Sequence, residues 1–149
     1  MMNPNLVNSL IAVHVALEVE QLLFHAYHWR SKGKDYYGDH LLYQRLYLAR
    51  AEEIDRIGEV LVPIGGENAV APLVTITGMH DLATRVEATP GPDAQRGLAL
   101  VTETLRRIND ANALLGKENL SLAINNVLAG IADKHLEALY LLKQRVGAG

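Results

Sequence analysis

The chain has 149 residues, 49% of them hydrophobic and 21% charged, which is ordinary usage for a globular domain with a full core. A formal net charge of −3 gives no electrostatic attraction to nucleic acid, and the absence of cysteine excludes thiolate metal sites. We therefore expect one domain over residues 1–149, in a reducing compartment such as the cytoplasm.

The first predicted helix covers residues 3–31. Asn3 can cap it, and Pro4 suits the first helical position. The apolar run from Leu6 to Val19 has no basic segment before it and contains His14 and Glu18, so we expect neither a signal peptide nor a membrane span. Apolar residues recur at three- and four-residue steps and predict a core-facing stripe, which consists of Leu6, Leu10, Val13, Leu17, Phe24 and Tyr27.

A second stripe on the same helix is polar and consists of His14, Glu18, Gln21, His25 and His28. The simpler interpretation of His14 and His25 places them at a subunit contact or at the solvent edge. A role for His14, Glu18 or His25 in metal binding stays open.

The second predicted helix covers residues 35–63. Gly33 ends the first helix and Asp35 can cap the second, so the short connection predicts antiparallel neighbours. It also brings His28 close to His40. Gly65 and Gly66 form the stop signal.

The sequence after Gly66 predicts a crossover and two more long helices. Residues 67–91 form a long connection with a short helix at 80–87. The third long helix begins at Pro92 and ends before Gly116, and the fourth begins near Asn119 and ends near Val146. No segment alternates as a strand would. The predicted fold class is all-α, with four long helices plus a crossover helix. The apolar positions of the third and fourth long helices are Leu98, Val101, Leu105, Ile108, Leu114, Leu122, Val127, Ile131, Leu136, Leu139 and Leu142.

Four side chains make a metal-ligand set: His28, His40, Asp55 and Glu59. At about 1.5 Å per residue, His40 lies roughly 22 Å from Asp55 and roughly 28 Å from Glu59, so one chain cannot close this site. An antiparallel copy related by a two-fold axis would set the histidines of one subunit against the carboxylates of the other. The alternative for Asp55 and Glu59 is a solvated helix face.

These residues carry a resemblance to the Dps-like miniferritins (DNA protection during starvation), four-helix members of the ferritin-like group. The matching positions are His28-Trp29, Gly33, Tyr36-Tyr37, His40, Asp55-x-x-x-Glu59, Gly65-Gly66 and Asp133-Lys134-His135. The resemblance implies a ferritin-like four-helix bundle with one long crossover. It also implies a twelve-subunit cage in which two-fold dimers share each site. Gln44 departs from the pattern, which usually has an acidic residue one turn after the second histidine.

The chemistry implied is ferroxidase activity: Fe(II) is oxidised by hydrogen peroxide or dioxygen, and Fe(III) mineral is stored. His28 and His40 would be the nitrogen ligands and Asp55 and Glu59 the oxygen ligands, a set that also suits Zn²⁺ or Mn²⁺. Two alternatives stay open: a DNA-binding, nucleoid-protecting shell, against which the net charge argues, and a cage whose centre is weakened by Gln44.

Three further expectations concern the same region and the last helix. A di-iron site inside one bundle needs Glu-x-x-His on each of two helices, and this pattern is absent from the sequence. Trp29 either packs in the core or, by resemblance, quenches oxidising equivalents together with Tyr36, Tyr43 and Tyr47. Asp133 and His135 are interpreted as hydrogen-bonded structural residues on a packed last helix.

Overall fold

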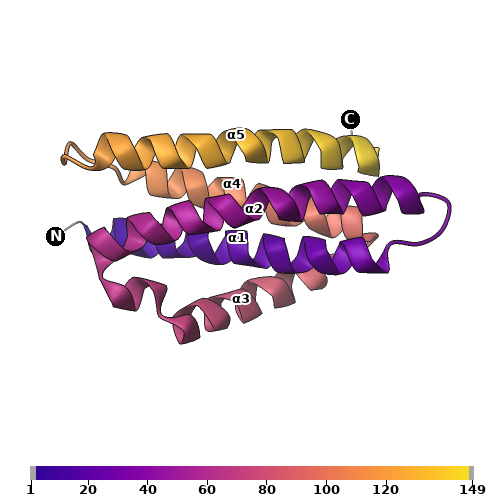
Figure 1. Cartoon of the computed structure of the whole chain (residues 1–149), viewed down its shortest axis with the longest axis horizontal. Coiled ribbons are helices and arrows are strands. Elements are labelled where there is room, and N and C mark those ends of the chain that lie inside the picture. Colours follow the sequence, from indigo (N-terminus) through magenta and orange to yellow (C-terminus); the bar gives the residue numbers. More distant parts are fainter. Residues whose placement is uncertain (1–2, 148–149) are drawn as a thin grey trace.

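The computed structural model describes residues 3–147. These residues form five α-helices. The elements in order are α1 (Pro4–Arg30), α2 (Tyr36–Gly65), a 3-10 turn η1 (Glu67–Val70), α3 (Pro72–Glu87), α4 (Asp93–Ala113) and α5 (Ser121–Val146). The four longer helices, α1, α2, α4 and α5, pack side by side along one axis, and α3 runs obliquely beside them (Figure 1). The predicted all-α class is confirmed, and no strand occurs within the described range.

Helix α1 is the central helix of the bundle and packs against α2, α3 and α4. The Asn3 side chain accepts a hydrogen bond from the Asn5 amide at 2.9 Å, as expected of a capping residue. All six residues of the predicted core stripe are buried. By length and composition α1 alone among the described helices could cross a membrane, but 56% of its apolar window is buried inside the bundle. Its apolar composition is that of a core helix.

The connection from α1 to α2 turns at Gly33, whose φ of 85° explains the glycine. The prediction that Asp35 caps α2 is wrong, because its side chain makes no capping hydrogen bond. The Asp35 carboxylate lies instead 3.5 Å from Arg145 near the end of α5. This ion pair joins the last turn of α5 to the start of α2.

The crossover is more helical than predicted. Helix α3 begins at Pro72 and not near residue 80, because proline at the first helical position is already in helical geometry and lacks only an amide that would stay unpaired. Helix α2 continues through Pro63 to Gly65 before Gly66 (φ 78°) ends it. The crossover returns the chain to the end where α2 began, so α2 and α4 run parallel (Figure 1).

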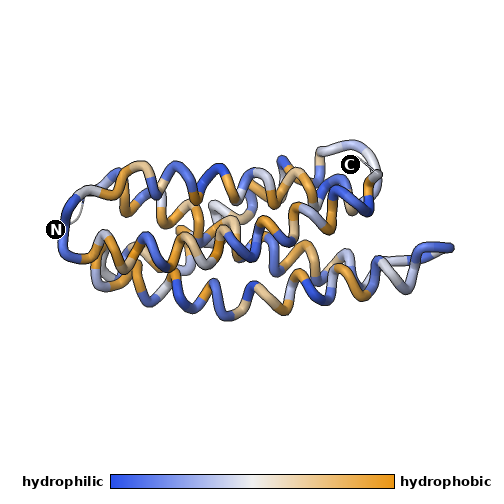
Figure 2. Tube along the Cα trace, turned by 90° about the horizontal axis from the view of Figure 1, so that it is seen from above, coloured by the Kyte–Doolittle hydropathy of each residue, from blue (hydrophilic) through white to orange (hydrophobic). Residues whose placement is uncertain are grey.

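Hydrophobic and hydrophilic residues alternate at short intervals along every helix (Figure 2), and the hydrophobic ones form two adjoining core clusters. Not every predicted apolar position belongs to them. Leu122 and Leu136 on α5 are 72% and 61% exposed, and Leu114 after α4 is also exposed. The buried residues of α5 lie on another side of the helix and include Ile124, Leu128, Ile131, Ala138 and Leu142.

The middle of the bundle is polar. Glu20 of α1, Arg50 and Glu53 of α2, and His135 of α5 are all buried and lie in contact with one another. We call these four residues the core ionic cluster. It holds one guanidinium for two carboxylates. Burial raises the pKa of Glu53 to about 7, although Arg50 and His135 oppose this shift.

Glu53 therefore makes stability depend on pH. Because the folded protein holds this proton more tightly than the unfolded chain, the stabilisation is complete below about pH 4.5 and is lost as the pH rises through about 7. We expect Glu53→Gln to gain stability relative to the parent between pH 5 and pH 8, by up to roughly 3 kcal/mol. Urea unfolding of both proteins at the two pH values measures this difference, and parallel pH profiles would contradict it.

Candidate metal centre

His28 and His40 meet where α1 ends and α2 begins. Their imidazole rings are stacked, with centroids 3.7 Å apart and planes inclined by 21°. His28 Nδ1 lies 2.7 Å from the backbone oxygen of His40, and His40 Nδ1 lies 3.0 Å from the backbone oxygen of His28. The expected proximity of these two histidines within one chain is present in the structure.

This reciprocal pairing determines where the protons sit. A carbonyl oxygen can only accept, so each Nδ1 carries a hydrogen and donates it. In the neutral rings the lone pairs are then at the two Nε2 atoms, which are free to bind a metal. Histidine ligands of metals are commonly held in this way, with the other ring nitrogen donating to a backbone carbonyl.

Aromatic rings surround the histidine pair. His25 is stacked between Trp29 and Tyr47, with centroid distances of 4.1 Å to each. Tyr36 stacks on His40 at 5.2 Å. The interpretation of Trp29 as a core residue is wrong, because its side chain is 69% exposed. This end of the bundle therefore presents a large aromatic surface to its surroundings.

Asp55 and Glu59 lie far from the histidines, toward the other end of α2. Both are exposed, and they line a surface cavity of about 660 Å³ together with His14. His14 is largely buried, but its side chain lines this surface cavity, and its Nε2 lies 3.5 Å from Glu18. Burial lowers the pKa of His14 and outweighs the opposing effect of Glu18, so this imidazole is neutral at pH 7.

One chain does not assemble the four predicted ligands. Within residues 3–147, no three His, Asp or Glu side chains converge on a point that could hold a metal ion. The single unbroken helix α2 keeps His40 and the carboxylates about 22 and 28 Å apart.

The exposed side of α2 that carries Asp55 and Glu59 is also unusually apolar. Four of the five large hydrophobic side chains that α2 exposes lie on this side, and they are Tyr37, Leu41, Leu48 and Val62. At about 100° per residue, all four lie within the same sector of the helix as the carboxylates. Apolar surface gathered on one face is characteristic of a contact with another protein surface.

The last helix differs from the expectation in one respect. His135 is fully buried, and its Nδ1 donates to the backbone oxygen of Ile131 at 2.8 Å, in agreement with a structural role. Asp133 is exposed and does not belong to the packed face.

Sequence reasoning also overlooked Glu20, Arg50 and Glu53. Glu20 is four residues from both Ala16 and Phe24 on the buried side of α1, and a charged residue in that place is the signal that could have revealed the cluster.

Comparisons with known proteins agree with this architecture. No protein-family model matches the chain. A DNA protection during starvation protein from Brevibacillus brevis is 29% identical over 112 residues, which span 75% of this chain and 66% of the relative, slightly less than two thirds of its length. The crystal structure of the DPS protein from Vibrio cholerae O1, described as a member of a broad superfamily of ferritin-like diiron-carboxylate proteins, superposes with a TM-score of 0.75. That match has 18% identity and covers 95% of this chain and 88% of the other. In its fold the chain is similar to the Vibrio cholerae protein, and in its sequence it is similar to the DNA protection during starvation protein from Brevibacillus brevis.

Proposed function

We propose that this protein is a ferroxidase and iron-storage protein of the cytoplasm. Fe(II) is the substrate and binds between two subunits, where His28 and His40 come from one chain and Asp55 and Glu59 from the other. Two Fe(II) ions give one electron each to hydrogen peroxide, which takes up two protons and leaves as two waters. The Fe(III) then collects as mineral inside a shell of twelve subunits. Zn²⁺ or Mn²⁺ can occupy the same ligand set.

The stacked pair of His28 and His40 is the observation that carries this proposal. Each Nδ1 is engaged by a backbone carbonyl, so both rings are oriented before any metal arrives. The carboxylates complete the set because their negative charge stabilises Fe(III) over Fe(II). His40 and the carboxylates lie toward opposite ends of one helix. An antiparallel copy of α2 therefore sets the histidine end of each helix against the carboxylate end of the other, which forms two equivalent sites.

Gln44 lies one turn after His40 and is half-buried. Its neutral amide can accept a bond from a bound water but adds no charge. We propose that each site therefore holds one iron tightly and a second only weakly. The net charge of −3 favours protection by removal of iron and peroxide over protection by binding DNA.

The two-fold arrangement predicts which residue lies on the axis. The midpoint of α2 between His40 and the carboxylate pair falls at Leu48, whose side chain is 61% exposed. In a two-fold contact this leucine meets its own copy. We expect Leu48→Arg to place two like charges on the axis, to weaken the dimer by on the order of 100-fold and to abolish rapid Fe(II) oxidation.

Sedimentation velocity and the rate of Fe(II) oxidation measure these two effects. Leu48→Met is the matched control, since it keeps an apolar side chain of similar volume and should leave both unchanged. If Leu48→Arg has normal helical content and still assembles and oxidises Fe(II) at the parent rate, the two-fold contact lies elsewhere on the chain.

A further inference from the structure

The core ionic cluster is made of the side chains that metal sites use. Glu20 and His135 are fully buried, Arg50 is 1% exposed and Glu53 is 7% exposed. Carboxylates and imidazoles together suit Fe(II), Zn(II) or Mn(II), and ferritin-like di-iron sites are built from such groups projecting inward from the helices of one bundle. Three of the four long helices contribute to this cluster at one level of the bundle.

Arg50 occupies the middle of the cluster. Its Nη1 lies 3.0 Å from Glu20 Oε1 and 2.5 Å from His135 Nε2, and its Nε lies 2.9 Å from Glu53 Oε1. The guanidinium thus contacts each of the three groups that could ligate an ion. This explains why no metal-binding triad converges there in the described residues, although the ligand types are present.

His135 is oriented as a metal ligand would be. Its Nδ1 donates to the Ile131 backbone oxygen at 2.8 Å, which turns Nε2 toward Glu20 Oε2 at 2.7 Å. The second carboxylate, Glu53, lies 3.6 Å from the same ring at the other nitrogen. Ligand atoms around one ion of this size are separated by roughly 3 to 3.5 Å. Nε2 and Glu20 Oε2 are already close to that separation, whereas Glu53 would have to rotate from the Nδ1 side of the ring to join them.

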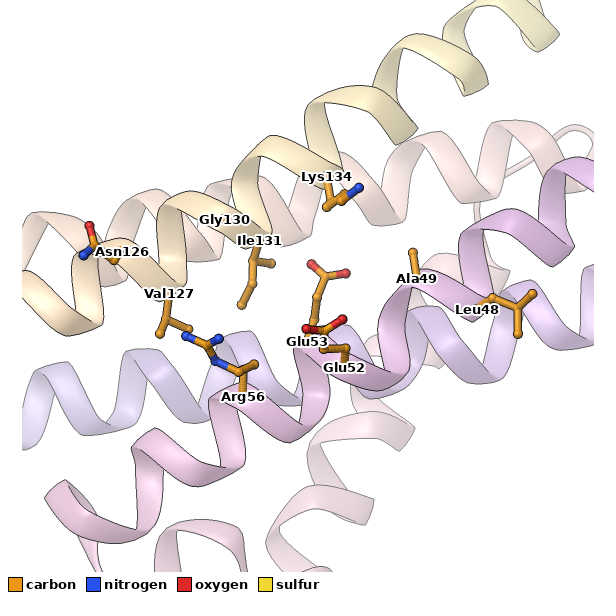
Figure 3. Close-up of a pocket in the computed structure, with 10 residues that line it drawn as sticks. All are labelled: Leu48, Ala49, Glu52, Glu53, Arg56, Asn126, Val127, Gly130, Ile131 and Lys134. Carbon is orange, nitrogen blue, oxygen red and sulfur yellow. The ribbon is translucent and has the colours of Figure 1, made fainter.

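Glu53 is incompletely satisfied and reachable from the surface. Neither of its carboxylate oxygens makes a hydrogen bond of acceptable geometry, although Arg50 Nε lies 2.9 Å from Oε1. Beside it a cavity of about 400 Å³ opens between α2 and α5, with Lys134 and Ile131 on the α5 side (Figure 3). An ion could enter the cluster by this route without unfolding the bundle.

We propose that Arg50 keeps metal ions out of the bundle core, since its guanidinium occupies permanently the place of a divalent cation between Glu20, Glu53 and His135. A di-iron site inside the subunit therefore does not fit this chain as it stands. Without the guanidinium, a divalent cation would balance the two carboxylates and leave the cluster neutral. Arg50 thereby confines metal binding to surfaces outside the core.

Arg50→Ala in a His28→Ala background tests this proposal with Co²⁺ as the probe, because the background removes a histidine of the interfacial ligand set. We expect the double variant to bind one additional Co²⁺ per subunit, with affinity increased about 100-fold or more over His28→Ala alone and with a visible absorption band from the nitrogen and oxygen ligands. Adding His135→Ala should abolish this gain. Arg56→Ala is the matched control, since Arg56 is exposed on the same helix and lines the same cavity.

Loss of Arg50 leaves two buried carboxylates without a cation, so folding is measured as well. If Arg50→Ala is unfolded without metal, Co²⁺ should restore its helical circular dichroism, and Arg50→Gln provides a milder variant for the same titration. The proposal is overturned if neither variant gains Co²⁺ binding or Co²⁺-dependent folding. It is equally overturned if the gain survives His135→Ala, because the ion then binds elsewhere.

Discussion

Replacing either His28 or Asp55 with alanine should slow Fe(II) oxidation by at least about 100-fold. The His28 variant loses a nitrogen ligand, and the Asp55 variant loses one of the two charges that stabilise Fe(III). Neither substitution should unfold the protein: Asp55 is exposed, and His28 lies at the end of α1, outside the two hydrophobic clusters. The near-ultraviolet absorbance of Fe(III) after rapid mixing with Fe(II) and hydrogen peroxide measures the rate.

Mixing the two variants should restore part of the activity. In a dimer of one His28→Ala chain and one Asp55→Ala chain, one site loses both groups and the other keeps its complete ligand set. Random assortment makes half of the dimers mixed, so about a quarter of all sites should be active.

The matched control mixes His28→Ala with His40→Ala. These histidines come from the same chain, so each site in a mixed dimer lacks one of them and no activity should return. Recovery in the control, or none in the first mixture, would contradict a site divided between chains as proposed.

Glu20→Ala is the substitution with the largest expected effect on stability. Glu20 is fully buried and lies 3.0 Å from Arg50 and 2.7 Å from His135. Burial disfavours its charge, but His135 and Arg50 outweigh burial and lower the pKa of Glu20, so it is ionised at pH 7. Removing Glu20 leaves Glu53 as the sole carboxylate of the cluster beside Arg50. Breaking such a buried pair lowers the free energy of unfolding by about 3–5 kcal/mol.

Asp110→Ala is the control for Glu20→Ala. Asp110 also pairs with an arginine, Arg106, at 2.7 Å, but the two side chains are 54% and 60% exposed. An exposed pair of this kind contributes about 0–1 kcal/mol because water screens it and both side chains lose freedom. Urea unfolding should therefore separate the two variants clearly, and equal midpoints would show that the core ionic cluster contributes no more than a surface pair.

Local signals in the sequence were sufficient for the helices and for one half of the site. The apolar spacing in α1 predicted its buried stripe, because a helix repeats every 3.6 residues whatever surrounds it. The short connection at Gly33 predicted that His28 and His40 meet, because so few residues cannot separate two helix ends. The distance between His40 and Asp55 likewise followed from helix rise alone.

Other features depended on how the helices pack. Leu122 and Leu136 are as apolar as Leu128, yet they face outward, because the rotation of α5 about its axis is set by contacts along the whole bundle. Asp35 could have capped α2, but Arg145 lies close enough to pair with its carboxylate, and a residue 110 positions away cannot be anticipated from a capping rule.

The sequence by itself determined the helical class and the separation of histidines from carboxylates, since each depends on residues near one another in the chain. Only the tertiary structure decided that Glu20, Arg50 and His135 meet in the core. Glu20 and His135 are 115 residues apart, and their contact exists because α1 and α5 are packed at one register and one rotation. Side-chain packing over the full length of the bundle selects that register, and no local pattern encodes it.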